Sequence, residues 1–170
     1  MDFDTEAVSK ITVPLILDRK LRGERITSLT AYDYPTARLV DEAGIDIILV
    51  GDSVAETVLG YGSTVPVTVE EMLHHLKAVR RAVRRALLVV DLPYGAYHAG
   101  AERAVETGVR YLKEGGAEAV KLEGGRRRAE VIRRLVEADL RLRSKPFALG
   151  NLSCAGGILF ESILRFGPER

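Results

Sequence analysis

The sequence predicts an α/β fold in which four consecutive strand–helix units build a parallel sheet. Short runs of branched apolar residues alternate four times with longer amphipathic runs, a pattern typical of parallel strands joined by right-handed helical crossovers. The chain has 170 residues, of which 46% are hydrophobic, enough to bury one core without a disulfide or a structural metal. A complete eight-unit β/α barrel takes about 250 residues, so this length excludes an ordinary one.

The first two strands are predicted at residues 26–30 (ITSLT) and 45–50 (IDIILV), each a short apolar run. Residues 36–43 lie between them and have the spacing of an amphipathic helix, with apolar residues at Ala37, Leu39, Val40 and Ala43. Gly44 occupies the position of a C-terminal cap, because glycine readily adopts the left-handed conformation that ends many helices.

A glycine-containing loop at residues 57–66 leads to the next predicted helix, which begins with a capping box. Thr68 is the predicted N-cap, and Glu71 lies three residues later, where its side chain reaches back to the N-cap backbone. This helix is predicted over residues 69–85. The elements predicted after it are a strand at 86–90 (ALLVV), a helix at 101–113, a strand at 117–122 (AEAVKL) and a helix at 126–138.

The alternation of strands and helices stops near residue 139. Residues 140–145 (LRLRSK) are too charged for a buried parallel strand, and residues 151–160 (NLSCAGGILF) are apolar without a clear period. We therefore divide the chain into residues 1–139, the N-terminal part of a β/α architecture, and residues 140–170, a divergent tail.

Charge and composition exclude several classes of function. The 25 Lys and Arg residues against 24 Asp and Glu give a net charge of +1, without the basic excess of proteins that bind nucleic acids or anionic membranes. The single Cys154 cannot form an internal disulfide, and no apolar run approaches the roughly 18 residues of a membrane span. We expect a soluble, cytoplasmic protein without nucleic-acid or membrane partners.

Each of the four predicted strands is followed by an acidic residue: Asp33, Asp52, Asp91 and Glu123. Ligands bind at the carboxyl ends of parallel strands, where the connecting loops meet. Several carboxylates converging there without His or Cys suit a hard cation, above all Mg²⁺. The alternative is that each acid caps the helix that follows it, as Asp often does.

Lys121 lies two residues before Glu123, so the two side chains of a strand would point to the same face. A lysine beside a metal-bound carboxylate can hold an anionic substrate or neutralise a developing negative charge. The alternative is a simple Lys–Glu ion pair at the end of the strand.

Other candidates carry weaker signals. Adjacent histidines on a helix diverge by about 100° and do not easily share a metal, and a lone cysteine is most often a small buried hydrophobe. The arginine groups are interpreted as solvated helix faces or subunit contacts. These candidates are His74 with His75, the loop residue His98, Cys154, the Gly60-Tyr61-Gly62 segment, and the arginines at 80, 81, 84, 85 and 126–128.

Six segments resemble a known enzyme family in their order and spacing. They are ITSLTAYDY at 26–34, ILVGDS at 48–53, LGYGSTVPVT at 59–68, AVRR at 78–81, VDLPY at 90–94 and VKLEGG at 120–125. Together they resemble ketopantoate hydroxymethyltransferase (3-methyl-2-oxobutanoate hydroxymethyltransferase) from about residue 11 to residue 139. The combination of TAYD, VGDS, STVPVT and K-x-E-G-G is highly specific.

The resemblance implies a (β/α)8 TIM barrel of the phosphoenolpyruvate/pyruvate superfamily, of which this chain holds about the first four units. It implies a homo-oligomer, because the family forms a decamer. The implied reaction moves a hydroxymethyl (one-carbon) group from 5,10-methylenetetrahydrofolate to 3-methyl-2-oxobutanoate, giving 2-dehydropantoate for pantothenate and coenzyme A biosynthesis. Mg²⁺ would stabilise the enolate of the oxo acid by Lewis-acid catalysis.

The resemblance also implies individual residue roles. Asp52 and Asp91 would ligate Mg²⁺, with Glu123 at the metal in its outer shell. The oxo acid would contact Asp52, Ser53, Asp91 and Lys121. Three of the four strand-end acids thus coincide with implied metal residues, and Asp33 is left with a structural or supporting role.

The chain departs from the family pattern at two places. Gly62 stands where the family has Asp, and after residue 139 the family continues with an apolar strand and a G-H-x-G-L-T-P-Q segment. The tail is therefore expected to be a frameshifted or truncated continuation. The family's general base, a Glu, lies beyond the matching region, so turnover is expected to be impaired by roughly 10²–10⁴-fold.

Two alternative functions remain open from the sequence. The first is another Mg²⁺-dependent 2-oxo-acid lyase or mutase of the same barrel superfamily. The second is an inactive half-barrel that needs a partner chain, because an open parallel sheet leaves two unpaired edges and an uncovered inner face.

Overall fold

Five parallel strands form one sheet in the computed structural model, which describes residues 9–138 and 148–150. Their spatial order is their chain order, and every neighbouring pair is parallel. A sequential order is that of an arc of a β/α barrel, whereas a doubly wound sheet reverses direction at a switch point. The strands are β1 (Ser28–Thr30), β2 (Ile47–Val50), β3 (Leu87–Asp91), β4 (Ala119–Leu122) and β5 (Ala148–Gly150).

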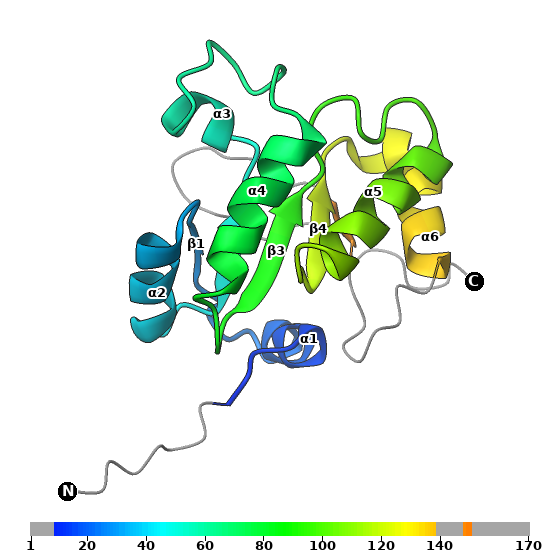
Figure 1. The fold of residues 1–170 in the computed structure, drawn as a ribbon. Helices are drawn as coiled ribbons and strands as arrows, with labels where there is room; N and C mark the ends of the chain where they lie inside the picture. The colour runs from blue at the N-terminus through cyan, green and yellow to red at the C-terminus, as the bar shows by residue number, and fades with distance from the viewer. Residues whose placement is uncertain (1–8, 139–147, 151–170) are drawn as a thin grey trace, which may run out of the picture.

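Helices follow the strands, and the longer of them cover one face of the sheet; Figure 1 shows α4 and α5 in front of β3 and β4. The short α3 lies beyond the end of β2, on the side of the sheet where the strands end. The helical segments are α1 (Val13–Leu21), α2 (Tyr34–Glu42), α3 (Val54–Thr57), α4 (Val69–Arg80), α5 (Ala101–Lys113), the 3₁₀ turn η1 (Gly125–Arg128) and α6 (Ala129–Glu137).

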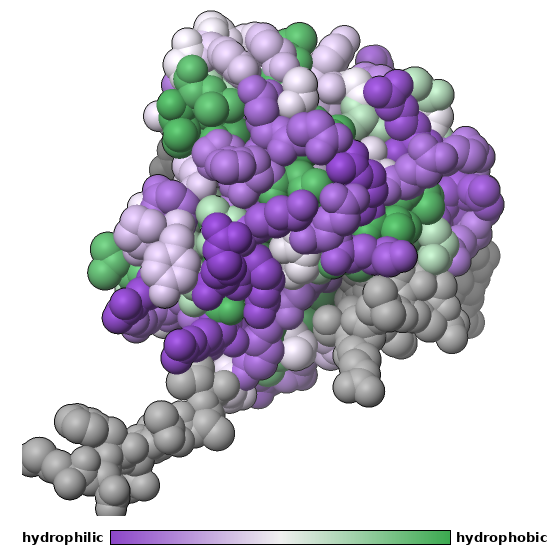
Figure 2. Space-filling view, viewed as in Figure 1, coloured by the Kyte–Doolittle hydropathy of each residue, from purple (hydrophilic) through white to green (hydrophobic). Residues whose placement is uncertain are grey.

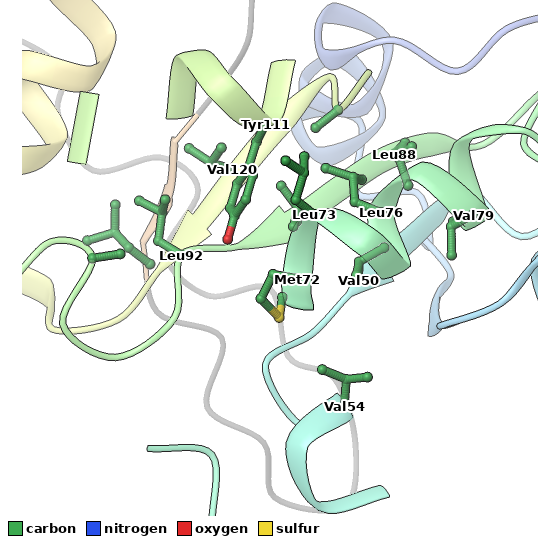
Figure 3. Close-up of a cluster of buried hydrophobic side chains, with 14 of the residues drawn as sticks. Val50, Val54, Met72, Leu73, Leu76, Val79, Leu88, Leu92, Tyr111 and Val120 are labelled. Atoms are coloured by element: carbon green, nitrogen blue, oxygen red, sulfur yellow. The ribbon is translucent and has the colours of Figure 1, made fainter. Parts of the chain in front are cut away.

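The main core lies between the sheet and these covering helices. Alternate residues of each strand point to the helices, because side chains of a strand alternate between its two faces. They pack against the apolar faces of α4 and α5, where Met72, Leu76 and Tyr111 are fully buried (Figure 3). Each such aliphatic side chain contributes roughly 1.5–3 kcal/mol by leaving water. The strand residues concerned are Ile48, Val50, Leu88, Val90, Val120 and Leu122.

The opposite face of the sheet is covered near the starts of its strands by α1 and the residues before it. Ile11 and Ile16 pack against Leu87 and Val89 in a second apolar cluster. The Ile11 N–H donates to the Arg85 carbonyl (2.8 Å), just before β3 begins. The helix α1 therefore closes the N-terminal end of the sheet and leaves the other end, where the strands terminate, to the loops.

The outward surface of α4 and α5 is mostly hydrophilic (Figure 2). Arg110 of α5 binds Glu70 of α4 (2.7 Å) and Glu114 after its own helix (2.8 Å). Exposed ion pairs of this kind stabilise a fold by at most about 1 kcal/mol each, so the covering helices are held chiefly by their apolar faces. Among the helices that the structure describes, none is long and apolar enough to cross a membrane.

The predicted alternation of four strands with four helices is confirmed, with shifts of a few residues at element ends. The helix α5 has the predicted bounds. The capping box is present: the Glu71 carboxylate accepts from the Thr68 N–H (2.7 Å), and the Thr68 hydroxyl accepts from the Glu71 N–H (3.2 Å). Gly44 has the predicted left-handed conformation, with φ +80°.

Some predictions were wrong. Of the apolar positions predicted on α2, Ala37 is buried but Leu39 is 68% exposed, and the helix also buries Asp41. The helix α4 ends at Arg80 instead of residue 85, because the N–H groups of residues 84 and 85 donate to the Asp41 carboxylate. The last predicted helix begins as the 3₁₀ turn η1. Neither α1 nor α3 was predicted.

The predicted tail lies outside the described residues except at 148–150. Those three residues form β5, parallel to β4, where no strand was predicted. The division of the chain at residue 139 stays a prediction.

Candidate functional site

Side chains from three neighbouring strands meet at the carboxyl end of the sheet. Asp91 is the last residue of β3, and it pairs in register with Lys121 of β4. Asp52 comes two residues after β2 ends, and Glu123 directly follows β4. Because parallel strands end at the same edge of a sheet, this register brings together four of the residues that the sequence predicted for the site: Asp52, Asp91, Lys121 and Glu123.

A buried ion pair lies at the centre of this group. The Lys121 Nζ donates to the Asp91 Oδ1 (2.6 Å), and each side chain is only 5% exposed. The other oxygen of Asp91 accepts from the Asp52 backbone N–H (3.2 Å). Both charges are therefore paired, as burial requires, since an unpaired charge in this position would be strongly destabilising.

Burial raises the pKa of Asp91 to about 6, even though the Lys121 ammonium opposes the shift. The pKa of Asp52 is also raised, first by burial and then by the nearby Glu123 carboxylate, with Lys121 opposing. Burial acts to lower the pKa of Lys121, but attraction to Asp91, Glu123 and Asp52 outweighs it and raises the pKa. Lys121 is thus charged and lies among carboxylates. A further positive charge would stabilise the ionised form of those carboxylates.

Glu123 and Asp33 occupy different environments from the buried pair. Glu123 is 65% exposed and lies 4.0 Å from the Lys121 Nζ, so the principal partner of Lys121 is Asp91 rather than Glu123. Asp33 caps α2: its carboxylate accepts from the Thr36 N–H (2.8 Å) and from the Thr36 hydroxyl (3.1 Å). For Asp33, the alternative that the acid caps the following helix is therefore confirmed.

Ser53 contacts a tyrosine that the sequence analysis did not single out. The hydroxyls of Ser53 and Tyr32 lie 2.7 Å apart. Gly51 lies against this pair: a Cβ there would lie 3.0 Å from the Ser53 Oγ and 3.4 Å from the Asp91 Oδ2. His75 of α4 binds the Tyr32 carbonyl (2.7 Å). The TAYD segment could have suggested Tyr32, because it immediately follows a strand.

The loop after β3 holds a cluster of rings, of which the sequence analysis named only His98, as a weak candidate. The His98 ring contacts the rings of Tyr94 and Tyr97, with centroid distances of 4.5 and 4.4 Å. The Arg128 guanidinium lies 5.6 Å from the Tyr97 ring centroid. Burial lowers the pKa of His98, and the charge of Arg128 adds to that shift. The available signal was three rings in a span of five residues, Tyr94 to His98, in the loop after β3.

Among the remaining candidates that the structure describes, two histidines and one arginine make other contacts. His74 and His75 make an edge-to-face contact at 5.4 Å, and the Nδ1 of His75 is engaged by Tyr32. Arg85 is bound to the Asp46 carboxylate (3.2 Å) and to two carbonyls, so the interpretation as a solvated helix face was wrong for this arginine. Cys154 lies outside the described residues.

The donor set fits Mg²⁺. Within residues 9–138 and 148–150, no three His, Cys, Asp or Glu side chains converge to form a metal cage. Mg²⁺ does not need one, because it is commonly held by one or two carboxylates and completes its octahedron with water and substrate oxygens. Asp52 and Asp91 supply two such carboxylates. With Glu123, three carboxylates face one ammonium, so a divalent cation would balance the formal charge of the group.

Comparisons with known proteins point to one family. The sequence profile described as ketopantoate hydroxymethyltransferase matches residues 10–144. The chain is 61% identical over 132 residues to the 3-methyl-2-oxobutanoate hydroxymethyltransferase of Koribacter versatilis, covering 78% of this chain and 45% of that protein. It is 62% identical over 122 residues to an enzyme of that name from Thermus thermophilus, covering 72% and 46%. The chain spans about half the length of the curated relatives it matches.

Solved structures agree on the fold. One is phosphonopyruvate hydrolase in complex with oxalate and Mg²⁺, with a TM-score of 0.60 at 18% identity, covering 82% of this chain and 52% of that chain. Another is 2,3-dimethylmalate lyase, a member of the PEP mutase/isocitrate lyase superfamily, with a TM-score of 0.60 at 20% identity, covering 82% and 53%. At these identities the likeness is one of fold, and it confirms the predicted barrel class.

Proposed function

The chain belongs to the ketopantoate hydroxymethyltransferase family, and on that basis we propose that its site binds 3-methyl-2-oxobutanoate for one-carbon transfer. The donor would be 5,10-methylenetetrahydrofolate and the product 2-dehydropantoate, in the pantothenate pathway. The observation that carries the proposal is the buried Lys121–Asp91 pair at the end of the sheet, with Asp52 directly beside it.

The oxo acid brings a carboxylate and a keto oxygen, both acceptors of hydrogen bonds. Lys121 is a buried ammonium with three donors, of which one is used by Asp91. Ser53 supplies a hydroxyl at the same edge. Hydrogen bonds between an anion and such donors are stronger than neutral ones, and they position the acid before any bond changes.

Asp52 and Asp91 would hold Mg²⁺, and Glu123 would add a third carboxylate near it. When bound, the metal would supply Lewis-acid stabilisation of negative charge on the keto oxygen, which makes the neighbouring C–H easier to deprotonate. Lys121 would keep Asp91 ionised and add positive charge on the same side. The general base is not among the residues to which we assign a role.

Calorimetric titration of the full chain with 3-methyl-2-oxobutanoate in Mg²⁺ tests this proposal. Binding should weaken by at least tenfold in Lys121→Met, because a charge-assisted hydrogen bond contributes about 1.5–3 kcal/mol. Lys77→Met is the matched control, since Lys77 is exposed on α4 and pairs only weakly with Glu114 (3.7 Å). Equal affinities in Lys121→Met and the unsubstituted chain would refute the assignment.

A second measurement separates this function from the lyase or mutase alternative. Incubation with the oxo acid and 5,10-methylenetetrahydrofolate should yield 2-dehydropantoate, and omission of the folate should abolish it. Cleavage or rearrangement of a 2-oxo acid without folate would instead favour the alternative.

A further inference from the structure

A continuous set of polar contacts connects α4 to the site through Tyr32. The Nδ1 of His75 lies 2.7 Å from the Tyr32 carbonyl oxygen, and because a carbonyl only accepts, His75 donates. The Tyr32 hydroxyl lies 2.7 Å from the Ser53 hydroxyl. Tyr32 follows β1 by two residues, so its backbone is held by both the sheet and α4.

Counting hydrogens at this hydroxyl pair shows that one donor remains for another acceptor. Tyr32 and Ser53 carry one O–H each, and a single hydrogen bond between them uses only one of the two. A phenol is the more acidic hydroxyl and the better donor, so the favoured arrangement has Tyr32 donating to the Ser53 oxygen. The Ser53 hydrogen is then free to donate elsewhere.

The surroundings restrict where that hydrogen points. A Cβ at Gly51 would lie 3.0 Å from the Ser53 Oγ, 3.4 Å from the Asp91 Oδ2 and 3.6 Å from the Tyr32 hydroxyl, so these three oxygens border one small space. A free serine side chain samples three χ1 rotamers. A hydrogen bond from a tyrosine that is itself fixed selects one of them and removes that entropy before a ligand arrives.

We propose that Tyr32 is a positioning residue, which orients the Ser53 hydroxyl as a donor to the carboxylate of the bound 2-oxo acid. This inference rests on the proposed function for the identity of that acceptor. Tyr32 does not contact the acid itself; it acts through Ser53. His75 supports the arrangement by holding the backbone of Tyr32 in place.

Four variants of the full chain test the proposal: Tyr32→Phe, Ser53→Ala, the double variant and the control Tyr111→Phe. Calorimetric titration with 3-methyl-2-oxobutanoate in Mg²⁺ should show affinity reduced about 3- to 10-fold in Tyr32→Phe, the range of one ordinary hydrogen bond. In the Ser53→Ala background, Tyr32→Phe should change affinity less than about twofold, because coupled residues are non-additive. Tyr111→Phe, which alters a core tyrosine of α5, should bind as the unsubstituted chain does.

The Hα–Hβ couplings of Ser53, measured by NMR without ligand, supply an independent readout. They should indicate one rotamer in the unsubstituted chain and averaging in Tyr32→Phe. An unchanged single rotamer in Tyr32→Phe would overturn the inference, as would an equal loss of affinity in both Ser53 backgrounds. If the unsubstituted chain does not bind the oxo acid, the proposed function fails, and the Ser53 couplings alone then decide the positioning role.

Discussion

Replacing Lys121 by methionine should destabilise the fold strongly, because it leaves the Asp91 carboxylate buried without a cation. The two charged atoms lie 2.6 Å apart and each side chain is 5% exposed. At an effective dielectric constant near 20, attraction at this distance amounts to about 6 kcal/mol, much of which offsets the desolvation of the two groups. Removing one partner of a buried pair typically reduces the free energy of unfolding by about 3–5 kcal/mol.

The same change should lower the Tm by roughly 6–20 °C, using about 2–4 °C per kcal/mol for a chain of this size. Urea denaturation at pH 8 measures the loss in free energy; this pH lies above the pKa of about 6 for Asp91 in the unsubstituted chain, and loss of the Lys121 charge would raise that pKa further. The double variant Lys121→Met/Asp91→Asn removes both charges and keeps an acceptor for the Asp52 N–H, so it should recover most of the lost stability.

Mg²⁺ gives the experiment a second arm. If Asp52 and Asp91 hold the ion, excess Mg²⁺ should raise the Tm of Lys121→Met more than that of the double variant, and EDTA should reverse the effect. A Lys121→Met variant as stable as the unsubstituted chain in EDTA would refute the account of the buried pair. An equal Mg²⁺ response in both variants would refute Asp91 as a ligand.

Three further changes should have distinct outcomes. Gly51→Ala should weaken oxo-acid binding in calorimetry and reduce stability by about 1–3 kcal/mol in urea, because the added methyl would crowd Ser53; unchanged binding would contradict this. The pKa of Asp46 is lowered: burial acts to raise it, but hydrogen bonds from Thr27 outweigh burial. The stability that the Asp46 carboxylate confers is therefore present above about pH 4 and is lost on further acidification. The difference in unfolding free energy between the unsubstituted chain and Asp46→Asn, about 1.5–3 kcal/mol at pH 7, should therefore shrink in denaturation curves below pH 4. Tyr111→Phe should leave stability unchanged or raise it by up to about 1 kcal/mol, since among the described residues its buried hydroxyl has no hydrogen-bond partner; a loss of about 2 kcal/mol would show that a partner exists.

The sequence predicted the alternation of strands and helices because apolar periodicity reports which face of an element is buried. It failed where a polar side chain replaced an apolar one in the core. Asp41 is buried on α2 and accepts hydrogen bonds from the backbone N–H groups of residues 84, 85 and 86. Those groups lie more than 40 residues away along the chain, so no local pattern could reveal that Asp41 ends α4 and leads the chain into β3.

The site was predictable in composition but not in its internal pairing. Acids after successive strands indicated convergence, and Asp52, Asp91 and Glu123 do gather at one edge. The exception, Asp33, was recognisable, because Pro35 and Thr36 after it are typical of a helix start. The pairing of Lys121 with Asp91 rather than Glu123 depends on the β3–β4 register, which the sequence did not specify.

The buried pair of the site requires the same β3–β4 register as the apolar core does. In β3, Val89 and Asp91 face the side of α1, whereas Leu88 and Val90 face the covering helices. A slip of one residue would exchange these sets and place the Asp91 carboxylate in the apolar layer among the helices, far from Lys121. The Lys121–Asp91 pair forms only in the observed register. In a slipped register the Asp91 carboxylate would be buried without a cation, so its burial cost disfavours those registers. The polar end of the sheet thus contributes to the specificity of the fold as well as to the chemistry proposed for it.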